Sequence, residues 1–172
     1  MTIEILDGNG AAAVAVRLAR VRCVPCFPIT PQTELIETIA QWKANNEIDL
    51  EFNQLEGEHS VLSAALGSQM TGARTFTATS SQGLLYMHEI LPIASGTRIP
   101  LVMVNVSRGL SAPVNLWPDH NDFLAMRDSG WIMFSCETNQ EVLDSIIMAY
   151  KIAENEKVLL QVLINMDGFI HS

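Results

Sequence analysis

The sequence predicts an α/β fold of three layers, in which a mainly parallel sheet is covered by helices on both faces. Short runs of β-branched and apolar residues recur along the chain, and the run 99–106 is the continuous apolar kind that parallel sheets bury on both faces. Between such runs, apolar residues recur at helical spacing. Strands that alternate with helices in this way are typical of βαβ units.

Length and composition favour one domain over residues 1–172 without a linker. The chain has 172 residues, of which 48% are hydrophobic. A chain of this size buries roughly two-thirds of its unfolded surface, which is enough for a self-supporting core. The sequence contains no internal repeat and no low-complexity tract.

The first half of the chain alternates helix and strand. Pro28 and Pro31 disfavour helix between them, so a strand should end there and a helix should begin only afterwards. Gly72 is expected to end the helix that begins at Glu58. The expected elements are a helix over 8–21, a strand near 23–27, a helix over 32–45, a strand at 50–53, a helix over 58–70 and a strand over 74–79.

The second half repeats the alternation around one long loop. The apolar run that ends at Val106 predicts a buried strand, and the polar, proline-containing segment after it predicts a loop. Asn139 is a residue type that caps helices, and it precedes an amphipathic stretch. The expected elements are a helix over 83–93, a strand over 100–106, a loop over 107–118, a strand over 131–134, a helix over 139–154 and a strand over 158–164.

The charge of the chain argues against two classes of partner. The 19 acidic and 10 basic residues give a formal net charge of −9, so nucleic acid and anionic membrane surfaces would be repelled. The run 99–106 is far shorter than the roughly 20 residues that a bilayer-spanning helix needs. The first four residues lack the basic start of a signal peptide. We therefore expect a cytoplasmic protein that binds neither nucleic acid nor membrane.

Cysteine and histidine spacing argues against a metal site in this chain. Cys23, Cys26 and Cys136 are an odd number, which indicates reduced thiols. Cys23-Val-Pro-Cys26 has the spacing of a metal, cluster or redox pair, but a four-thiolate cluster needs a fourth cysteine and this pair straddles an expected buried strand. We therefore favour buried structural thiols. Metal-ligand spacing is also missing from the four histidines, His59, His88, His120 and His171.

Chemistry is expected in the loops that follow the strands. In open α/β sheets, ligands bind beyond the carboxyl ends of the strands. The segments expected there are Pro28-Ile-Thr-Pro31, Glu56-Gly-Glu58, Ser80-Ser-Gln-Gly83 and Ser107-Arg-Gly-Leu-Ser-Ala-Pro113.

Glu58 is the most informative single residue. It precedes Val61, Leu62 and Ala65 by three, four and seven positions and therefore shares their helix face, so we expect it to be buried. The helix amino terminus would favour its charged form and burial its neutral form, which suits a carboxyl group that shares a proton. The alternative is an ordinary first-turn acid that complements the helix dipole.

Arg108 and Thr30 are the other candidates for ligand contact. Arg108 follows a strand expected at mid-sheet, and its planar guanidinium can hold a carboxylate with two parallel hydrogen bonds. The alternative is a surface arginine paired with Asp119 or Asp122. Thr30 lies between two prolines, and its hydroxyl is either a hydrogen-bond donor to a ligand or part of a turn.

Six segments, taken in order, resemble the α subunit of pyruvate:ferredoxin oxidoreductase and its relatives, the 2-oxoacid:ferredoxin oxidoreductases. Each string alone is weakly specific, but six at matching intervals are highly specific, and the match covers nearly the whole chain. The segments are Phe27-Pro-Ile-Thr-Pro-Gln-Thr33, Glu56-Gly-Glu-His-Ser60, Thr75-Phe-Thr-Ala-Thr-Ser-Ser-Gln-Gly-Leu84, Arg108-Gly-Leu-Ser-Ala-Pro113, Asp119-His-Asn-Asp122 and Asp167-Gly-Phe169.

The resemblance implies the thiamin-diphosphate-binding fold, with this chain as its pyrimidine domain. Glu58 matches the catalytic glutamate that hydrogen-bonds the aminopyrimidine ring of thiamine diphosphate and favours the imino tautomer, which takes the proton from the thiazolium carbon. Pro28 and Ile29, with Thr30 beside them, match the loop that lines the pyrimidine pocket. Thr30 and Arg108 match the residues that hold the oxo and carboxylate groups of the substrate.

The same resemblance implies CoA-dependent oxidative decarboxylation of a 2-oxoacid, with pyruvate as the first candidate, or the reverse synthesis. Ferredoxin would accept the electrons through 4Fe-4S clusters, and coenzyme A would take the acyl group. This chain lacks the G-D-G…N motif for Mg²⁺ and diphosphate and the cluster cysteines, so a β subunit and other subunits or domains are expected to supply them. The family's second α-subunit domain is also absent, which makes the chain either a cut piece or a naturally split subunit.

Two other functions stay open at this point. A two-subunit thiamine-dependent decarboxylase would release an aldehyde and need no clusters. A non-catalytic assembly domain would keep the fold as a binding surface, although it would have no physical need for a buried Glu58. The apolar composition and the missing second domain predict an exposed hydrophobic face that a partner covers.

Overall fold

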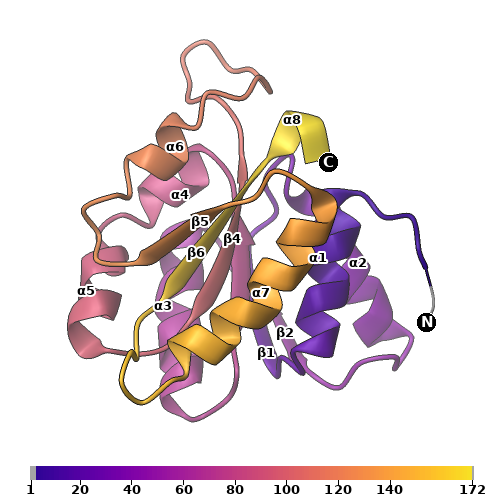
Figure 1. The fold of residues 1–172 in the computed structure, drawn as a ribbon, viewed down its shortest axis with the longest axis vertical. Coiled ribbons are helices and arrows are strands. Elements are labelled where there is room, and N and C mark those ends of the chain that lie inside the picture. The colour runs from indigo at the N-terminus through magenta and orange to yellow at the C-terminus, as the bar shows by residue number, and fades with distance from the viewer. Residues whose placement is uncertain (1–2, 172) are drawn as a thin grey trace.

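The computed structural model describes residues 3–171, and its strands form the parallel arrangement that the sequence predicts (Figure 1). From edge to edge the strands are β2 (Glu51–Gln54), β1 (Cys23–Cys26), β3 (Phe76–Thr79), β4 (Val102–Ser107), β6 (Val162–Asp167) and β5 (Ile132–Ser135). Each pairing between these strands is parallel, and a bridge between Cys23 and Thr75 joins the β1–β2 pair to the larger sheet. The α/β fold class is therefore confirmed.

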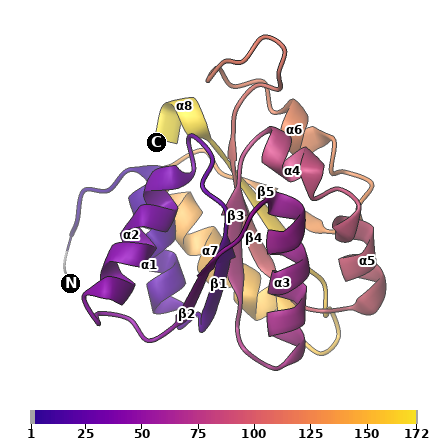
Figure 2. The same cartoon turned by 180° about the vertical axis from the view of Figure 1, so that it is seen from behind.

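Helices cover both faces of the sheet (Figures 1 and 2). One face carries α1 (Gly8–Leu18), α2 (Thr33–Ala44) and α7 (Asn139–Ala153), and the other carries α3 (Glu58–Met70), α4 (Gln82–Tyr86), α5 (Ile90–Thr97) and α6 (Asn121–Leu124). Val102 and Val104 of β4 pack in the core beneath α1 and α7, whereas Met103 packs beneath α3 and α5. Burial on both faces explains why β4 is a continuous apolar run.

Most predicted bounds lie within three residues of those observed, the short helix α6 was not predicted, and two elements differ more widely. The helix expected over 83–93 is divided into α4 and α5, because Pro92 has no N–H to donate and stands in the first turn of a new helix. The strand expected over 158–164 is β6 at 162–167, because the N–H groups of residues 158 and 159 bond to the Asn155 carbonyl in a turn. In residues 3–171, no helix has the length and apolar character needed to cross a membrane.

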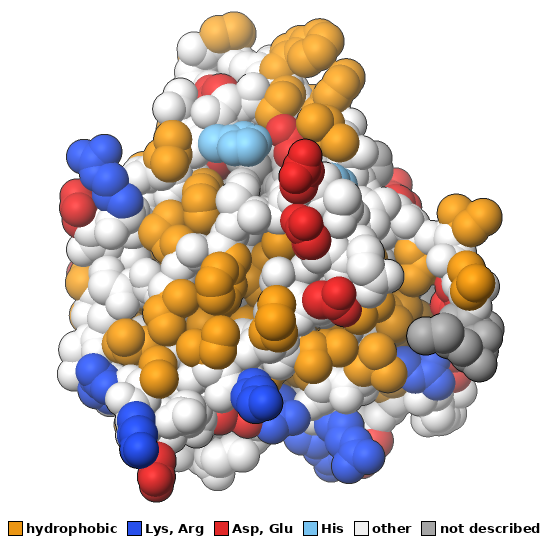
Figure 3. Space-filling view, in the orientation of Figure 1, with side chains coloured by type: hydrophobic (Ala, Val, Ile, Leu, Met, Phe, Trp, Pro, Cys, Tyr) orange, Lys and Arg blue, Asp and Glu red, His pale blue; other side chains and the backbone are white. Residues whose placement is uncertain are grey.

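The carboxyl ends of the strands lie at the upper edge of the molecule in Figure 1, where α8 (Gly168–His171) follows β6 and a long loop follows β4. Apolar side chains gather on this edge (Figure 3). The rings of Trp117 and Phe169 stack there with centroids 4.8 Å apart. The exposed apolar residues of the edge, called here the upper patch, are Val114, Leu116, Trp117, Phe169 and Ile170.

Candidate functional site

The segments predicted to carry chemistry all lie at this carboxyl edge. Residues 28–31 follow β1, Glu58 follows β2, residues 80–83 follow β3 and Arg108 follows β4. β1 has β2 on one side and β3 on the other, so the order of strands reverses direction beside it. Open α/β sheets bind ligands at such reversals.

Glu58 begins α3 and is buried, with 8% of its surface exposed, as its helix pattern predicts. A Cβ atom added to Gly83 would lie 2.6 Å from Glu58 Oε1 and 2.4 Å from the Thr79 hydroxyl, so the carboxylate rests against the backbone of Gly83. Within residues 3–171, this carboxylate has no hydrogen bond or ion pair. Neither carboxylate oxygen is among the fully buried unpaired atoms of the described residues, so a ligand can still reach the carboxylate. The arrangement is typical of a carboxylate that binds a ligand.

The turn between β3 and α4 is held in a conformation that its residues do not prefer. Ser81 has φ +50°, in the region that residues other than glycine rarely adopt. Its N–H donates to Asp122 Oδ2 at 3.0 Å, and its hydroxyl lies 3.0 Å from the Gly109 carbonyl. The held turn presents Gly83 to Glu58.

Arg108 is partly buried at the end of β4, and its Nη2 donates to Gln82 Oε1 at 3.4 Å. Its buried Nε has no acceptor in the described part of the chain. The surface pair with Asp119 or Asp122 is not formed within residues 3–171. The positive charge of the guanidinium is therefore available to an anionic ligand.

Asp122 is a residue of this edge whose role sequence reasoning missed, because it was considered only as a surface partner of Arg108. It is fully buried and accepts four hydrogen bonds. Oδ1 accepts from the Ser107 hydroxyl at 2.6 Å and the Phe123 N–H at 2.7 Å, and Oδ2 accepts from the Ser81 N–H at 3.0 Å and the Asn105 amide at 2.9 Å. These bonds fasten the turn after β3 to the end of β4. The only signal in the sequence was that Asp122 ends the Asp-His-Asn-Asp segment. An acid in such a polar segment is usually exposed, so its burial was not expected.

Two amide side chains hold the loop after β1 in place through hydrogen bonds. Gln32 accepts from the Ile29 N–H at 3.3 Å and donates to a β3 carbonyl at 3.1 Å, and Asn9 donates to the carbonyl of the second proline at 3.0 Å. Pro28 and Thr30 are exposed, whereas Ile29 is partly buried. The loop is thus a rigid support that leaves the Thr30 hydroxyl accessible.

The structure brings the candidates together in two groups. Glu58 and Arg108 contact consecutive residues of the same turn. The loop that carries Thr30 is tied to the end of β4 through Gly168 instead. A Cβ atom added to Gly168 would lie 2.3 Å from Pro31 Cγ and 2.8 Å from the last carbonyl of β4. Both groups are therefore anchored at the end of β4.

The cysteines are buried thiols without a disulfide, as predicted. Burial raises the pKa of Cys26 to about 11 and also raises the pKa of Cys136. Thiols with raised pKa stay protonated and unreactive at neutral pH. Among residues 3–171, no three side chains of His, Cys, Asp or Glu gather where they could hold a metal ion.

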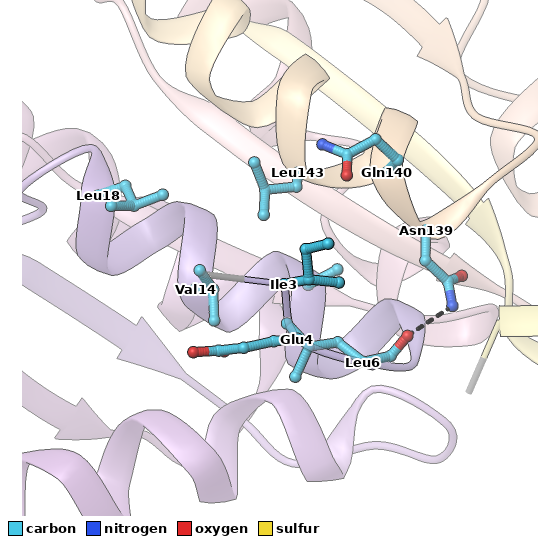
Figure 4. Close-up of a pocket in the computed structure, with 9 residues that line it drawn as sticks. Ile3, Glu4, Leu6, Val14, Leu18, Asn139, Gln140 and Leu143 are labelled. Atoms are coloured by element: carbon cyan, nitrogen blue, oxygen red, sulfur yellow. Dashed lines mark hydrogen bonds between the residues drawn. The ribbon is translucent and has the colours of Figure 1, made fainter. Parts of the chain in front are cut away.

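A groove of about 590 Å³ lies away from these residues, between the N-terminal segment and helices α1 and α7 (Figure 4). Asn139 closes one end by donating to the Leu6 carbonyl at 2.9 Å. The candidate site is thus an open edge and not this groove, because Thr30, Glu58 and Arg108 do not line it. Its apolar lining includes Ile3, Leu6, Ala11, Val14, Leu18 and Leu143.

Comparison with known protein families decides which family this is. The profile described as "Pyruvate flavodoxin/ferredoxin oxidoreductase, thiamine diP-bdg" matches residues 14–172. The chain belongs to this family. The resemblance seen in the sequence is confirmed, and the matched range includes Pro28, Ile29, Thr30, Glu58 and Arg108.

Curated relatives agree with this assignment. Pyruvate synthase subunit PorA of Methanocaldococcus jannaschii is 56% identical over 168 residues, which are 98% of this chain and 43% of the relative. Ketoisovalerate oxidoreductase subunit VorA of Pyrococcus horikoshii is 50% identical over 155 residues, which are 90% of this chain and 39% of the relative. The chain therefore spans less than half the length of these relatives.

Solved structures support the thiamin-diphosphate-binding fold. A 2-oxoglutarate:ferredoxin oxidoreductase from Magnetococcus marinus, solved with 2-oxoglutarate, coenzyme A and succinyl-CoA bound, superposes with a TM-score of 0.83 at 27% identity. The match covers 96% of this chain and 29% of that one. Benzoylformate decarboxylase from Polynucleobacter necessarius gives a TM-score of 0.73 at 15% identity over 98% of this chain and 31% of that one, which indicates a shared fold alone.

Proposed function

We propose that this chain is the pyrimidine-binding domain of a 2-oxoacid:ferredoxin oxidoreductase that acts on pyruvate together with partner subunits. The reaction is the oxidative decarboxylation of the 2-oxoacid with coenzyme A to acyl-CoA, CO₂ and reduced ferredoxin, or the reverse synthesis. The observation that carries the proposal is the buried Glu58 carboxylate, which rests against Gly83 in a chain of a thiamine-diphosphate-binding family.

The residues of the carboxyl edge fit the aminopyrimidine end of thiamine diphosphate. Glu58 is buried without a hydrogen-bond partner among the described residues, and the missing side chain of Gly83 lets the carboxylate lie directly against the backbone. Glu58 would hold a proton at its carboxyl group opposite a ring nitrogen. Pro28 and Ile29 would line the ring. Thiamine diphosphate, when bound, supplies the carbon nucleophile that attacks a 2-oxo group.

Arg108 and Thr30 would hold the two polar ends of the substrate. The Arg108 guanidinium is not neutralised by a carboxylate within residues 3–171, so it suits the carboxylate of a 2-oxoacid. The Thr30 hydroxyl is accessible on a fixed loop and can donate to the oxo oxygen. Together they would orient the bond that breaks when CO₂ leaves.

The other groups of the reaction are assigned to partners. We place Mg²⁺ and the diphosphate on a β subunit and the 4Fe-4S clusters on other subunits or domains, with ferredoxin as the electron acceptor. The upper patch supports this assignment, because exposed apolar residues such as Trp117 and Phe169 flank the open edge. An apolar surface of this kind is typical of a face that a partner covers.

Pyruvate is the first substrate to test, and 2-oxoisovalerate is the second. The chain is 56% identical to a pyruvate synthase subunit and 50% identical to a ketoisovalerate oxidoreductase subunit, so similarity alone does not separate them. The two acids share the 2-oxo and carboxylate groups and differ in their alkyl groups. Arg108 and Thr30 would therefore treat them alike.

The test compares Glu58→Gln with Glu56→Gln in the native complex that contains this chain. Glu56 is exposed in the same turn, and the Ser60 hydroxyl lies 2.6 Å from its Oε1, so it is a matched control. Reduction of a viologen dye is followed anaerobically with pyruvate and coenzyme A. Glu58→Gln should lower kcat by about 10²-fold or more, as expected for a lost acid–base group. Glu56→Gln should change kcat by less than about two-fold, as is usual for a surface substitution.

Each alternative has its own outcome in this experiment. An intact complex that reduces no dye with any 2-oxoacid would sink the oxidoreductase proposal. Aldehyde release by a complex without iron and sulfide would identify a thiamine-dependent decarboxylase. An unchanged rate in Glu58→Gln would contradict the role of Glu58 and favour an assembly domain.

A further inference from the structure

Gln82 is the one described residue that accepts a hydrogen bond from the Arg108 side chain. Arg108 Nη2 donates to Gln82 Oε1 at 3.4 Å, and the Ser81 hydroxyl lies 2.7 Å from the same oxygen. The guanidinium nitrogen of Arg108 can only donate, so the Gln82 atom that faces it is assigned as the amide oxygen. The single hydroxyl proton of Ser81 is shared between this oxygen and the Gly109 carbonyl. The buried Nε2 of Gln82 has no partner in residues 3–171.

The acceptor that orients Arg108 is neutral, and this matters for an anion site. A carboxylate at this place would hold the guanidinium more firmly, but it would also cancel the charge that a substrate anion needs. An amide oxygen fixes the direction of the guanidinium and leaves its charge intact. The partly buried setting strengthens this difference, because charges there are screened less than in bulk water.

Gln82 is itself held in place, which a positioning role requires. It follows Ser81, whose φ of +50° is kept by the bond from its N–H to the buried Asp122 and by the contact of its hydroxyl with the Gly109 carbonyl. Gly109 adjoins Arg108 along the chain. The Ser81–Gly109 contact therefore joins the residues that adjoin Gln82 and Arg108, and it holds the turn next to the arginine.

We propose that Gln82 is a positioning residue that aims Arg108 at the carboxylate of an anionic 2-oxoacid while leaving the arginine charge unpaired. The inference rests on the proposed function, because it takes the Arg108 ligand to be a substrate carboxylate. Gln82 would therefore favour anionic over neutral ligands. A glutamate at this position would weaken the binding of every anionic substrate, whatever its alkyl group.

The test uses Gln82→Glu, Gln82→Met and the control Gln41→Glu in the intact complex. Gln41 is exposed on α2, so its variant adds the same charge away from the site. Binding of oxamate, an unreactive carboxylate analogue of pyruvate, is measured by titration calorimetry. Neutral oxamide, which lacks the carboxylate, is titrated in the same way as a control. Gln82→Glu should weaken oxamate binding by about 10-fold or more, through pairing with Arg108 and repulsion of the anion. Gln82→Met should weaken it less, and Gln41→Glu should match wild type.

Steady-state kinetics give the second readout. The KM for pyruvate should rise in the same order as the oxamate dissociation constant, with the larger change in KM and the smaller in kcat. Oxamate affinity in Gln82→Met equal to wild type would overturn the positioning role. Equal losses in the Glu and Met variants, or no loss in Gln82→Glu, would overturn the claim that a neutral acceptor is needed. A wild-type complex that neither binds oxamate nor reduces dye with 2-oxoacids would overturn the proposed function instead.

Discussion

Two arginines at opposite edges of the sheet show how differently those edges are built. Arg74, before β3, donates to the Glu154 carboxylate through two hydrogen bonds of 2.5 Å and lies 5.2 Å from the centre of the Tyr150 ring. Arg108, after β4, makes one bond of 3.4 Å to the neutral Gln82. Both side chains are partly buried, so the difference lies in their partners and not in their exposure to water.

The contrast extends to the groups around each arginine. At the amino edge, Tyr150 donates to the Thr75 carbonyl at 2.9 Å, and burial raises its pKa well above the usual value, so the hydroxyl stays protonated. At the carboxyl edge, several buried polar atoms have no partner within residues 3–171. Paired groups stabilise the fold, whereas unpaired buried groups cost stability and persist where a ligand contacts them. Those nearest Arg108 are Thr79 Oγ1, Ser80 Oγ, Gln82 Nε2 and Arg108 Nε, whereas one unpaired atom, Gln161 Oε1, lies at the amino end of β6.

The largest expected effect in this comparison comes from adding a side chain at Gly83, where Glu58 packs against the backbone. In Gly83→Ala, the new Cβ atom would lie 2.6 Å from Glu58 Oε1 and 2.4 Å from the Thr79 hydroxyl, so the carboxylate must move. A displacement of about 1 Å in a catalytic group can cost about 10²-fold in rate. We therefore expect dye reduction by the complex to fall by about 10²-fold.

The matched control is Gly67→Ala in α3. A Cβ atom added to Gly67 meets nothing within 4 Å, and alanine stabilises a helix relative to glycine by about 0.5–1 kcal/mol. This variant should keep full activity and melt at the same or a higher temperature. Equal activity in the two variants would mean that the carboxylate tolerates displacement and that the carboxyl edge is not the reacting edge.

The next effect separates the two arginines directly. Arg108→Met should lower kcat/KM for pyruvate by about 10-fold or more through the lost charge–carboxylate contact, with little change in melting temperature. Arg74→Met should lower stability by an amount on the order of 1–2 kcal/mol, because the Glu154 pair is partly exposed to water. The rate per folded complex should stay the same. Thermal melting and dye reduction on both variants check this, and a large activity loss in Arg74→Met would break the division between the edges.

The sequence predicted those parts of the molecule that depend on pattern within one segment. β4 follows from a continuous apolar run, and the burial of Glu58 follows from local spacing with a period of about 3.6 residues. Pro92 also carried a local signal, because proline is common in the first helical turn, but the sequence prediction of one helix over 83–93 did not use it. These features need no knowledge of which segments meet in space.

The parts that could not be predicted depend on contacts between segments far apart in the chain. Asp122 bonds to a residue 41 positions away, and Gln82 meets Arg108 across 26 positions. An acid in a polar loop and a glutamine at a turn are both usually exposed, so their residue types gave no warning. Sequence reasoning named the groups that we propose contact a ligand, but it did not identify the roles of Asp122 and Gln82 in holding the neighbouring turn.

The smallest expected effect concerns a buried group near the carboxyl edge that is not expected to bind a ligand. Cys26 ends β1, and burial raises its pKa from an ordinary value of 9.0 to about 11. Iodoacetamide should therefore label Cys26 in the native complex far more slowly at pH 8 than in the unfolded chain, and the rate should rise toward pH 11. Because the unfolded thiol loses its proton first, the contribution of Cys26 to stability should be constant below pH 9 and fall between pH 9 and 11.

Fast labelling at pH 8, read by mass spectrometry, would contradict a structural thiol and reopen the Cys23–Cys26 pair as a reactive site. Slow labelling would support the comparison. It would show that Cys26 is buried only for packing, whereas the unpaired polar groups near Arg108 are the ones that we expect to contact a ligand.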